Sequence, residues 1–372
     1  MVMIRDSALA VRGGLRGHRA VPGTMKAAVF AGPGRLELRE RPVPEPGPLD
    51  ALVRVTLTSI CRTDVHILRG EHPARSGIVL GHEPVGVIAA LGEAVRDYHV
   101  GERVVAGAVT PCGQCEACLS GQGSQCGGRA SGGWRLGHTL DGCQAEYVLV
   151  PDARANLARI PEELTDEQVL MCPDVLSAGI AGAEQGGVRL GDTVAVFAQG
   201  PVGLCATAGA RLLGAARIFV VDALENRLAM ARRLGADETI NYTAVDPVAV
   251  IRDLTGGRGV DVAIEALGAP ETFDGALRVL RPGGTLSSLG LYSGKVTLPV
   301  DAFAAGLGDY RVVATLCPGG KERMRRLLQV LTAGRLDLRP LITHRFRLDD
   351  VEAAYDLFAH QRDGVLKVAI TP

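Results

Sequence analysis

Short apolar runs broken by Pro and Gly predominate in the first half of the chain. Examples are residues 25–30 (Met-Lys-Ala-Ala-Val-Phe), 51–55 and 84–88. Runs of this length between turn residues predict β-strands rather than helices. The Pro-rich segment 41–48 is neither helix nor central strand, because Pro lacks a backbone N–H donor. The pattern therefore predicts a partly open β-barrel in residues 25–177.

Apolar strands alternate with helical segments in residues 178–316. Strands are expected at 193–197, 217–222, 261–265 and 284–289, and helices at 206–214 and 225–234. This alternation predicts an α/β fold with a Rossmann-type, doubly wound parallel sheet covered on both faces by helices. The last segment, 317–372, returns to short strands and helices and is assigned to the barrel domain. Residues 1–24 are expected to be a flexible N-terminal extension.

The composition limits the class of protein. The 40 basic residues balance 41 acidic ones, and aromatic residues make up only 4%, which argues against a nucleic-acid-binding protein. The sequence contains no run of about 18 consecutive apolar residues, which a membrane-spanning helix would need. Nine cysteines without a signal peptide favour a cytoplasmic protein with reduced thiols that are available to bind metal.

The turn after the strand at 193–197 carries a nucleotide-binding pattern. It reads Ala-Gln-Gly-Pro-Val-Gly over residues 198–203, so Ala198 stands where the usual fingerprint has its first Gly. Such glycines let the backbone approach a pyrophosphate and let the helix, whose N-terminus attracts phosphate, pack closely on the strand. Asp222 ends the next strand, where a carboxylate binds a ribose 2′-hydroxyl and repels a 2′-phosphate, and this predicts NAD rather than NADP. Arg227 covers the adenine side or weakens that preference. The predicted cofactor contacts are Gly200, Pro201, Val202, Gly203, Asp222 and Arg227.

Four cysteines lie within 15 residues. They are Cys112, Cys115, Cys118 and Cys126. Four thiolates so close in sequence can complete a tetrahedral zinc site that leaves no position for water, so the site is predicted to be structural. An iron–sulfur cluster is a weaker interpretation, because the last spacing is seven residues and no Pro follows Cys126.

A second motif carries a family resemblance. The pattern Gly-His-Glu-x₂-Gly-x₅-Gly-x₂-Val, from residue 81 to residue 95, matches the zinc signature of the medium-chain, zinc-dependent alcohol dehydrogenases. From Met25 to its end the chain resembles this family, whose fold combines a GroES-like barrel with a Rossmann domain. Asp174, Trp134 and the segment 316–320 are most similar to the bacterial secondary-alcohol dehydrogenases. Those enzymes often lack the four structural cysteines that this chain keeps.

The resemblance implies a catalytic zinc ion held by Cys61, His82 and Asp174, with water or alcohol as the fourth ligand. Glu83 is then a transient ligand or a group behind the ligands, and Asp64 binds the far nitrogen of His82. Cys172 lies two residues before Asp174 on a segment expected to be extended, and is interpreted as a structural cysteine.

The resemblance also implies the reaction, in which an alcohol loses hydride to NAD. Thr63 and His66 would carry the proton away from the alcohol, and Val202 would lie behind the nicotinamide. The expected assembly is a homo-oligomer, a tetramer as in the relatives, with strand 284–291 pairing across a dimer interface. Two zinc ions per subunit and a small alcohol or ketone as substrate complete the prediction. The predicted substrate pocket consists of Trp134, Leu291, Leu316 and Cys317.

Two alternatives stay open from the sequence. One is a polyol or amino-alcohol dehydrogenase on the same scaffold, against which Trp134 argues mildly because it favours an apolar substrate. The other is a non-catalytic relative that binds NAD and zinc, against which the presence of Thr63, His66 and all three metal ligands argues.

Overall fold

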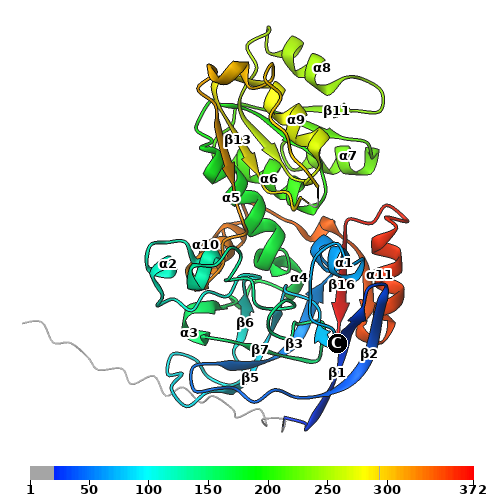
Figure 1. Ribbon diagram of the computed structural model, residues 1–372. Helices are drawn as coiled ribbons and strands as arrows, with labels where there is room; N and C mark the ends of the chain where they lie inside the picture. The colour runs from blue at the N-terminus through cyan, green and yellow to red at the C-terminus, as the bar shows by residue number, and fades with distance from the viewer. Residues whose placement is uncertain (1–20, 293) are drawn as a thin grey trace, which may run out of the picture.

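The computed structural model describes residues 21–292 and 294–372 and divides into two units (Figure 1). In the view of Figure 1 the strand-rich unit lies below and the helix-covered sheet lies above, with α5 (Ser177–Gly186) at their junction. The predicted N-terminal extension lies outside the described residues as far as residue 20. Strand β1 (Thr24–Gly32) begins at Thr24, the last residue assigned to the predicted extension.

The lower unit contains two sheets. In the smaller one, β2 (Arg35–Pro42), β1 and β4 (Ile78–Val79) pair antiparallel. The larger sheet has the order β15-β16-β3-β5-β6-β8, and β7 also pairs with β3. Its strands are β3 (Ala51–Ser59), β5 (Val85–Leu91), β6 (Arg103–Ala106), β7 (Tyr147–Val150), β8 (Leu157–Arg159), β15 (Ile342–Arg347) and β16 (Lys367–Thr371).

The C-terminal segment belongs to this lower unit. Strand β16 pairs antiparallel with β3, and the red C-terminal strand stands beside the blue N-terminal ones in Figure 1. The helices of the unit are α1 (Arg62–Leu68), α2 (Glu116–Leu119), α3 (Ala153–Asn156), α4 (Asp166–Val169), α10 (Lys321–Thr332) and α11 (Val351–Ala359). No helix in the described part of the chain is both long and apolar enough to cross a membrane.

The upper unit is a six-stranded parallel sheet of order β11-β10-β9-β12-β13-β14. Its strands are β9 (Thr193–Phe197), β10 (Arg217–Asp222), β11 (Glu238–Asn241), β12 (Val260–Glu265), β13 (Leu280–Ser288) and β14 (Arg311–Ala314). Its remaining helices are α6 (Pro201–Leu212), α7 (Glu225–Arg233), α8 (Pro247–Leu254) and α9 (Pro270–Arg278).

Alternate residues of the central strands enter two different hydrophobic cores. Val194 and Val196 of β9 pack into the core that holds residues of α5 and α6, whereas Ala195 and Phe197 pack into the core that holds residues of α8 and α9. A strand buried on both faces needs a continuous apolar run, and this explains the sequence of β9. The predicted α/β fold class is confirmed.

Two predicted elements need correction. The segment expected as a sheet edge, 284–291, forms most of β13, but β13 pairs with β12 on one side and β14 on the other. On this side of the sheet the edge strand is β14, whose four residues are too short a run to predict a strand from the pattern alone. The helix expected from residue 206 begins at Pro201, because Pro at the first helical position needs no N–H partner.

Candidate active site

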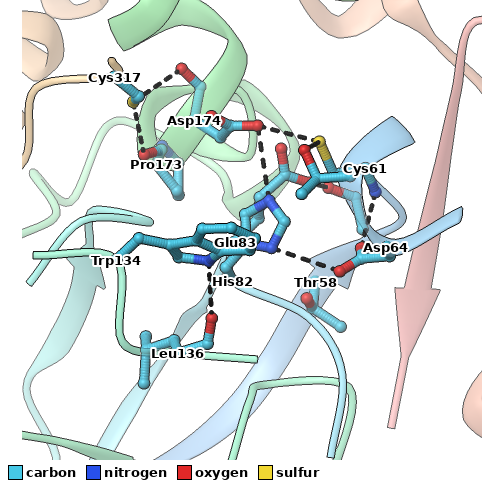
Figure 2. A network of polar contacts seen from close by, with 12 residues as sticks. Thr58, Cys61, Asp64, His82, Glu83, Trp134, Leu136, Pro173, Asp174 and Cys317 are labelled. Atoms are coloured by element: carbon cyan, nitrogen blue, oxygen red, sulfur yellow. Dashed lines mark hydrogen bonds and ion pairs between the residues drawn. The ribbon is translucent and has the colours of Figure 1, made fainter. Parts of the chain in front are cut away.

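A cleft of about 260 Å³ is lined by residues from both units. It is bordered on one side by the start of α1 and on the other by the turn that opens α6. Figure 2 shows its polar centre, where side chains from separate segments point toward one another. Among the predicted site residues, those that line it are Cys61, Thr63, His66, His82, Trp134, Asp174, Gly200, Pro201, Val202, Arg227, Leu291, Leu316 and Cys317.

Three side chains in the cleft present metal-ligating atoms to one point. Cys61 Sγ lies 3.2 Å from Asp174 Oδ2, and His82 Nε2 lies 3.6 Å from the same oxygen. All three ligand atoms lie within 4.8 Å of one another. Sulfur, nitrogen and carboxylate oxygen are the donors that zinc prefers, and three protein donors leave a coordination position open. The residues present therefore fit a catalytic zinc ion.

Each ligand comes from a different local structure. Cys61 is the residue that caps the N-terminus of α1, His82 follows β4 in an irregular segment, and Asp174 lies in a single helical turn, Cys172–Leu176. His82 is buried, with only 3% of its surface exposed. Although burial opposes the imidazolium charge, the carboxylates of Asp64 and Asp174 outweigh it and raise the pKa of His82.

Asp64 supports two of these ligands at once. One carboxylate oxygen lies 3.3 Å from His82 Nδ1, on the side of the ring away from Asp174. The other accepts the N–H of Cys61 at 2.9 Å (Figure 2). It also accepts an N–H of Gln144 at 3.3 Å. The far nitrogen of His82 therefore faces a carboxylate, as expected for an imidazole whose other nitrogen ligates a metal.

Thr63 and His66 lie one helical turn apart on α1, and both line the cleft. The Thr63 hydroxyl is 3.6 Å from Cys61 Sγ. The ring Nδ1 of His66 is hydrogen-bonded to the carboxylate of Glu71, which the sequence analysis did not include. Glu71 lies five residues after His66, across the end of a helix. No known motif has this spacing, so no sequence pattern indicated the contact.

Glu83 is not among the side chains that converge on this point. Its carboxylate accepts the hydroxyl of Ser59 and lies 2.6 Å from Lys367 Nζ. Glu83 and Lys367 are both fully buried, so each charge needs the other as its partner. Of the two roles expected for Glu83, this structure has the carboxylate behind the ligands, paired with a lysine 284 residues away, and the transient-ligand role stays a prediction.

Cys172 also differs from expectation in its local structure. The segment is a helical turn rather than extended chain, and Cys172 is fully buried in the hydrophobic core. Burial raises the pKa of its thiol to about 12. A thiol that stays protonated is a packing residue, in agreement with its structural interpretation.

The glycine turn at the start of α6 has the space that a dinucleotide needs. A Cβ added at Gly200 would meet no atom within 4 Å, whereas one at Gly203 would lie 1.9 Å from the carbonyl oxygen of Ala198. Gly200 therefore faces open space, and Gly203 allows the helix to pack closely on the strand. Ala198 adopts a positive φ of 70°, a conformation that favours Gly and explains the glycine of the usual fingerprint.

Asp222 lies directly beneath this turn. Its carboxylate accepts the N–H of Gln199 at 2.7 Å and those of Ala223 and Leu224 at 2.8 and 3.0 Å. Arg227 Nη1 lies 3.6 Å from the same carboxylate. Arg62, the residue after Cys61, also lines the cleft and brings a second guanidinium to it. The sequence analysis missed Arg62, although its position beside a metal ligand was a usable signal.

The four-cysteine lobe has the dimensions of a closed zinc site. Cys115 Sγ lies 3.4 Å from Cys118 Sγ and 3.9 Å from Cys126 Sγ, and the sulfurs of Cys112 and Cys118 are 4.0 Å apart. Tetrahedral zinc with ligands at ~2.3 Å requires sulfur separations of roughly 3.8 Å. The N–H of Gly127 donates to Cys115 Sγ at 3.2 Å and lowers the pKa of that thiol to about 6. The four sulfurs therefore fit the ion.

Similarity to known proteins decides the family. Residues 47–162 match the alcohol dehydrogenase GroES-like domain, and residues 201–333 match the zinc-binding dehydrogenase domain. An alcohol dehydrogenase from Cupriavidus necator is 59% identical over 361 residues, which cover 94% of this chain and 99% of that protein. The chain belongs to the zinc-dependent alcohol dehydrogenases.

This alcohol dehydrogenase has further relatives along nearly its whole length. An NADP-dependent isopropanol dehydrogenase from Thermoanaerobacter brockii is 35% identical over 350 residues, covering 93% of this chain and 99% of that protein. The solved structure of an alcohol dehydrogenase from Thermus sp. ATN1 superposes with a TM-score of 0.84 at 35% identity, covering 93% of this chain and 99% of that one. The predicted family is confirmed, and the dehydrogenase is an oxidoreductase of alcohols and carbonyl compounds.

Proposed function

We propose that this dehydrogenase interconverts small secondary alcohols and ketones with NAD as the hydride acceptor. The observation that carries the proposal is the convergence of Cys61, His82 and Asp174 on one point of a cleft that also contains the Gly200 turn. Zinc held by these three side chains supplies a Lewis acid that favours proton loss from an alcohol. NAD bound at the turn supplies the hydride acceptor.

The side chains of α1 give the alcohol proton a route out of the cleft. In this proposal the Thr63 hydroxyl, which lies 3.6 Å from Cys61 Sγ, accepts the proton first and passes its own proton on. His66 follows one turn later, and its Nδ1 is occupied by Glu71. In this proposal Nε2 is the nitrogen of His66 that receives the proton, because Glu71 holds the other one.

Apolar side chains favour an uncharged substrate with carbon on both sides of the hydroxyl. The predicted pocket residues Trp134, Leu291, Leu316 and Cys317 all line the same cleft. The name of the Thermoanaerobacter brockii relative, an isopropanol dehydrogenase, supports the same substrate class. A polyol or amino alcohol would need polar partners at these positions.

Asp222 supports NAD as the cofactor, in contrast to the NADP-dependent relative. A carboxylate at the end of the second strand repels a 2′-phosphate, and the guanidinium of Arg227, 3.6 Å from Asp222, is already paired with this carboxylate. Catalytic efficiency with NAD should exceed that with NADP at least several-fold, about 1 kcal/mol or more.

A steady-state assay tests cofactor and substrate together. Zinc-loaded enzyme is assayed on primary, secondary and aromatic alcohols with each cofactor, alongside Asp222→Gly and the matched surface control Asp253→Gly. We expect the best turnover with secondary alcohols and NAD, and a loss of the NAD preference only in Asp222→Gly. Equal or better use of NADP by the unaltered enzyme contradicts the cofactor assignment. Preference for polyols contradicts the substrate assignment.

We further propose that the dehydrogenase forms a homotetramer built from dimers that pair along β14. This strand is one of the two outer strands of the sheet, and no strand of the described residues pairs with its other side, which could therefore pair with a second copy. Apolar side chains around it are exposed, namely Val300, Leu307 and Val312. Light scattering at micromolar concentration should give the tetramer mass, and a stable monomer would refute the proposal.

A further inference from the structure

Two histidines that no step of the proposed reaction uses pack against the substrate pocket. The imidazole of His138 stacks on the Trp134 indole with ring centroids 4.4 Å apart and planes inclined by 10°. The imidazole of His72 lies 5.2 Å from the same indole, inclined by 30°, and 5.5 Å from His138. The three rings form one aromatic cluster.

The cluster lies on one side of the indole. If the imidazoles enclosed Trp134 from opposite faces, their centroids would be separated by nearly the sum of their distances to it. At 5.5 Å they are neighbours, so both lie on the same side. Trp134 lines the cleft, whereas neither His72 nor His138 does. The two imidazoles therefore contact the indole from outside the cleft, which Trp134 itself lines.

The turn that carries these rings is joined to the metal site. The indole Nε1–H donates to the carbonyl of Leu136 at 3.1 Å, and the ring lies 6.0 Å from the His82 ring in an edge-on arrangement (Figure 2). Gly137 adopts a φ of 70°, and a Cβ there would lie 3.0 Å from the carbonyl oxygen of Gly81. The turn therefore packs directly on the residue before His82, so a shift of Trp134 changes the space beside the proposed zinc ion.

We propose that His138 and His72 are positioning residues that hold Trp134 as a rigid wall and thereby set the upper size limit of the alcohol. This inference rests on the proposed function, because it takes the cleft to be the alcohol site. Burial lowers the pKa of His72, and the nearby His138 and His66 lower it further, which favours the neutral ring that stacks without repelling its neighbour. Removal of either imidazole leaves space into which the indole can rotate.

Trp134 is the only tryptophan of the chain, so its fluorescence reports on the wall directly. The variants are His138→Ala, His72→Ala and the ring-preserving His138→Phe, with His99→Ala as a control at an exposed histidine. Emission maximum, acrylamide quenching and thermal stability are measured for each. Catalytic efficiency is measured with 2-propanol and with the bulkier 1-phenylethanol.

His138→Ala should shift the emission to the red, increase quenching and raise the efficiency ratio of 1-phenylethanol to 2-propanol by about tenfold, a usual effect of altered pocket space. His72→Ala should act in the same direction with a smaller change. His138→Phe should restore both readouts, which loss of general stability would not explain, and His99→Ala should leave them unchanged.

Unchanged emission and an unchanged efficiency ratio in both alanine variants would overturn the inference. If the unaltered enzyme oxidises no alcohol, the size-limit claim fails with the proposed function. The fluorescence measurements then still decide whether the two histidines position Trp134, because they need no turnover.

Discussion

The two proposed metal sites differ in how their ligands are brought together. The four sulfurs of the closed site come from residues 112–126 and are partly exposed. The open site takes Cys61, His82 and Asp174 from segments up to 113 residues apart and buries them at the junction of two units. Four ligands in one short loop complete the coordination of zinc, whereas three ligands at a cleft leave room for a substrate.

The supporting contacts differ in the same way. At the closed site, backbone N–H groups of Gly127 and Cys112 donate to Cys115 and Cys126. At the open site the carboxylate of Asp64 faces His82, and Thr63 stands next to Cys61. A local loop can satisfy its thiolates with its own backbone, but a site that must move a proton needs side chains with defined roles. The comparison therefore separates a site for stability from a site for chemistry.

The largest effect is expected at the open site. His82→Ala removes the nitrogen ligand and should lower turnover by at least ~10³-fold, because Lewis-acid stabilisation is worth several kcal/mol. Metal analysis should show about one zinc ion per chain instead of about two, with little change in melting temperature. The control is His99→Ala, at an exposed histidine. Turnover within tenfold of the unaltered enzyme would remove His82 from the site.

The next effect concerns the proton route, which only the open site requires. Thr63→Val should lower turnover by ~10²–10⁴-fold, the usual contribution of a positioned proton-transfer group, while zinc content and NAD binding persist. Thr63→Ser keeps the hydroxyl and should retain most activity. Near-normal turnover of Thr63→Val across the pH range would show that the proton leaves by another route.

A change at the closed site should affect stability before activity. Cys115→Ser should lower the melting temperature by at least roughly 5 °C, given ~2–4 °C per kcal/mol for a domain of this size. Turnover per folded enzyme should stay within about twofold of the unaltered enzyme at low temperature, because none of the residues 112–126 lines the cleft. Differential scanning calorimetry with zinc analysis measures both. A parallel loss of turnover without unfolding would contradict the assignment of a structural role.

The smallest effect is a difference in how zinc affinity depends on pH. Protons compete with zinc for its ligands, so affinity falls as pH falls. At the closed site the pKa of Cys115 is already lowered to about 6, so zinc must displace protons mainly from the other three thiols. At the open site burial raises the pKa of Cys61, and Asp64 raises that of His82, but His82 keeps the pKa of Asp174 below its usual range. Between pH 6 and 7.5 zinc therefore displaces about three protons at the closed site and about two at the open site.

Each of the two variants above isolates one site for this measurement. A chromogenic chelator competes for zinc with His82→Ala, which keeps the closed site, and with Cys115→Ser, which keeps the open one. The logarithm of the affinity should fall about 1.5 times as steeply with decreasing pH at the closed site as at the open site between pH 6 and 7.5. Equal slopes would contradict the different protonation of the two sites.

Tertiary contacts account for what the sequence analysis missed. Lys367 holds Glu83 from 284 residues away, so no local pattern around the zinc signature could show that this carboxylate is already paired. Glu71 and His66 meet only because the chain turns at the end of α1. Strand β14, rather than β13, forms the sheet edge on that side because β14 pairs in parallel along the outer side of β13.

The sequence by itself determined the features whose partners lie within a few residues. The cysteine spacing over residues 112–126 brings four sulfurs to zinc-binding separations, and the turn at 198–203 opens space at Gly200 within one strand–turn–helix unit. Short loops and the start of a helix have few alternative geometries, so residue type and spacing are sufficient.

The tertiary structure alone decided which side chains share the cleft. Cys61, His82 and Asp174 converge because β3, the zinc-signature segment and the helical turn before α5 pack at the junction of the two units. The support of Trp134 by His72 likewise joins residues far apart in sequence. Such contacts depend on the relative placement of whole elements, which burial of apolar faces stabilises but which no local pattern specifies.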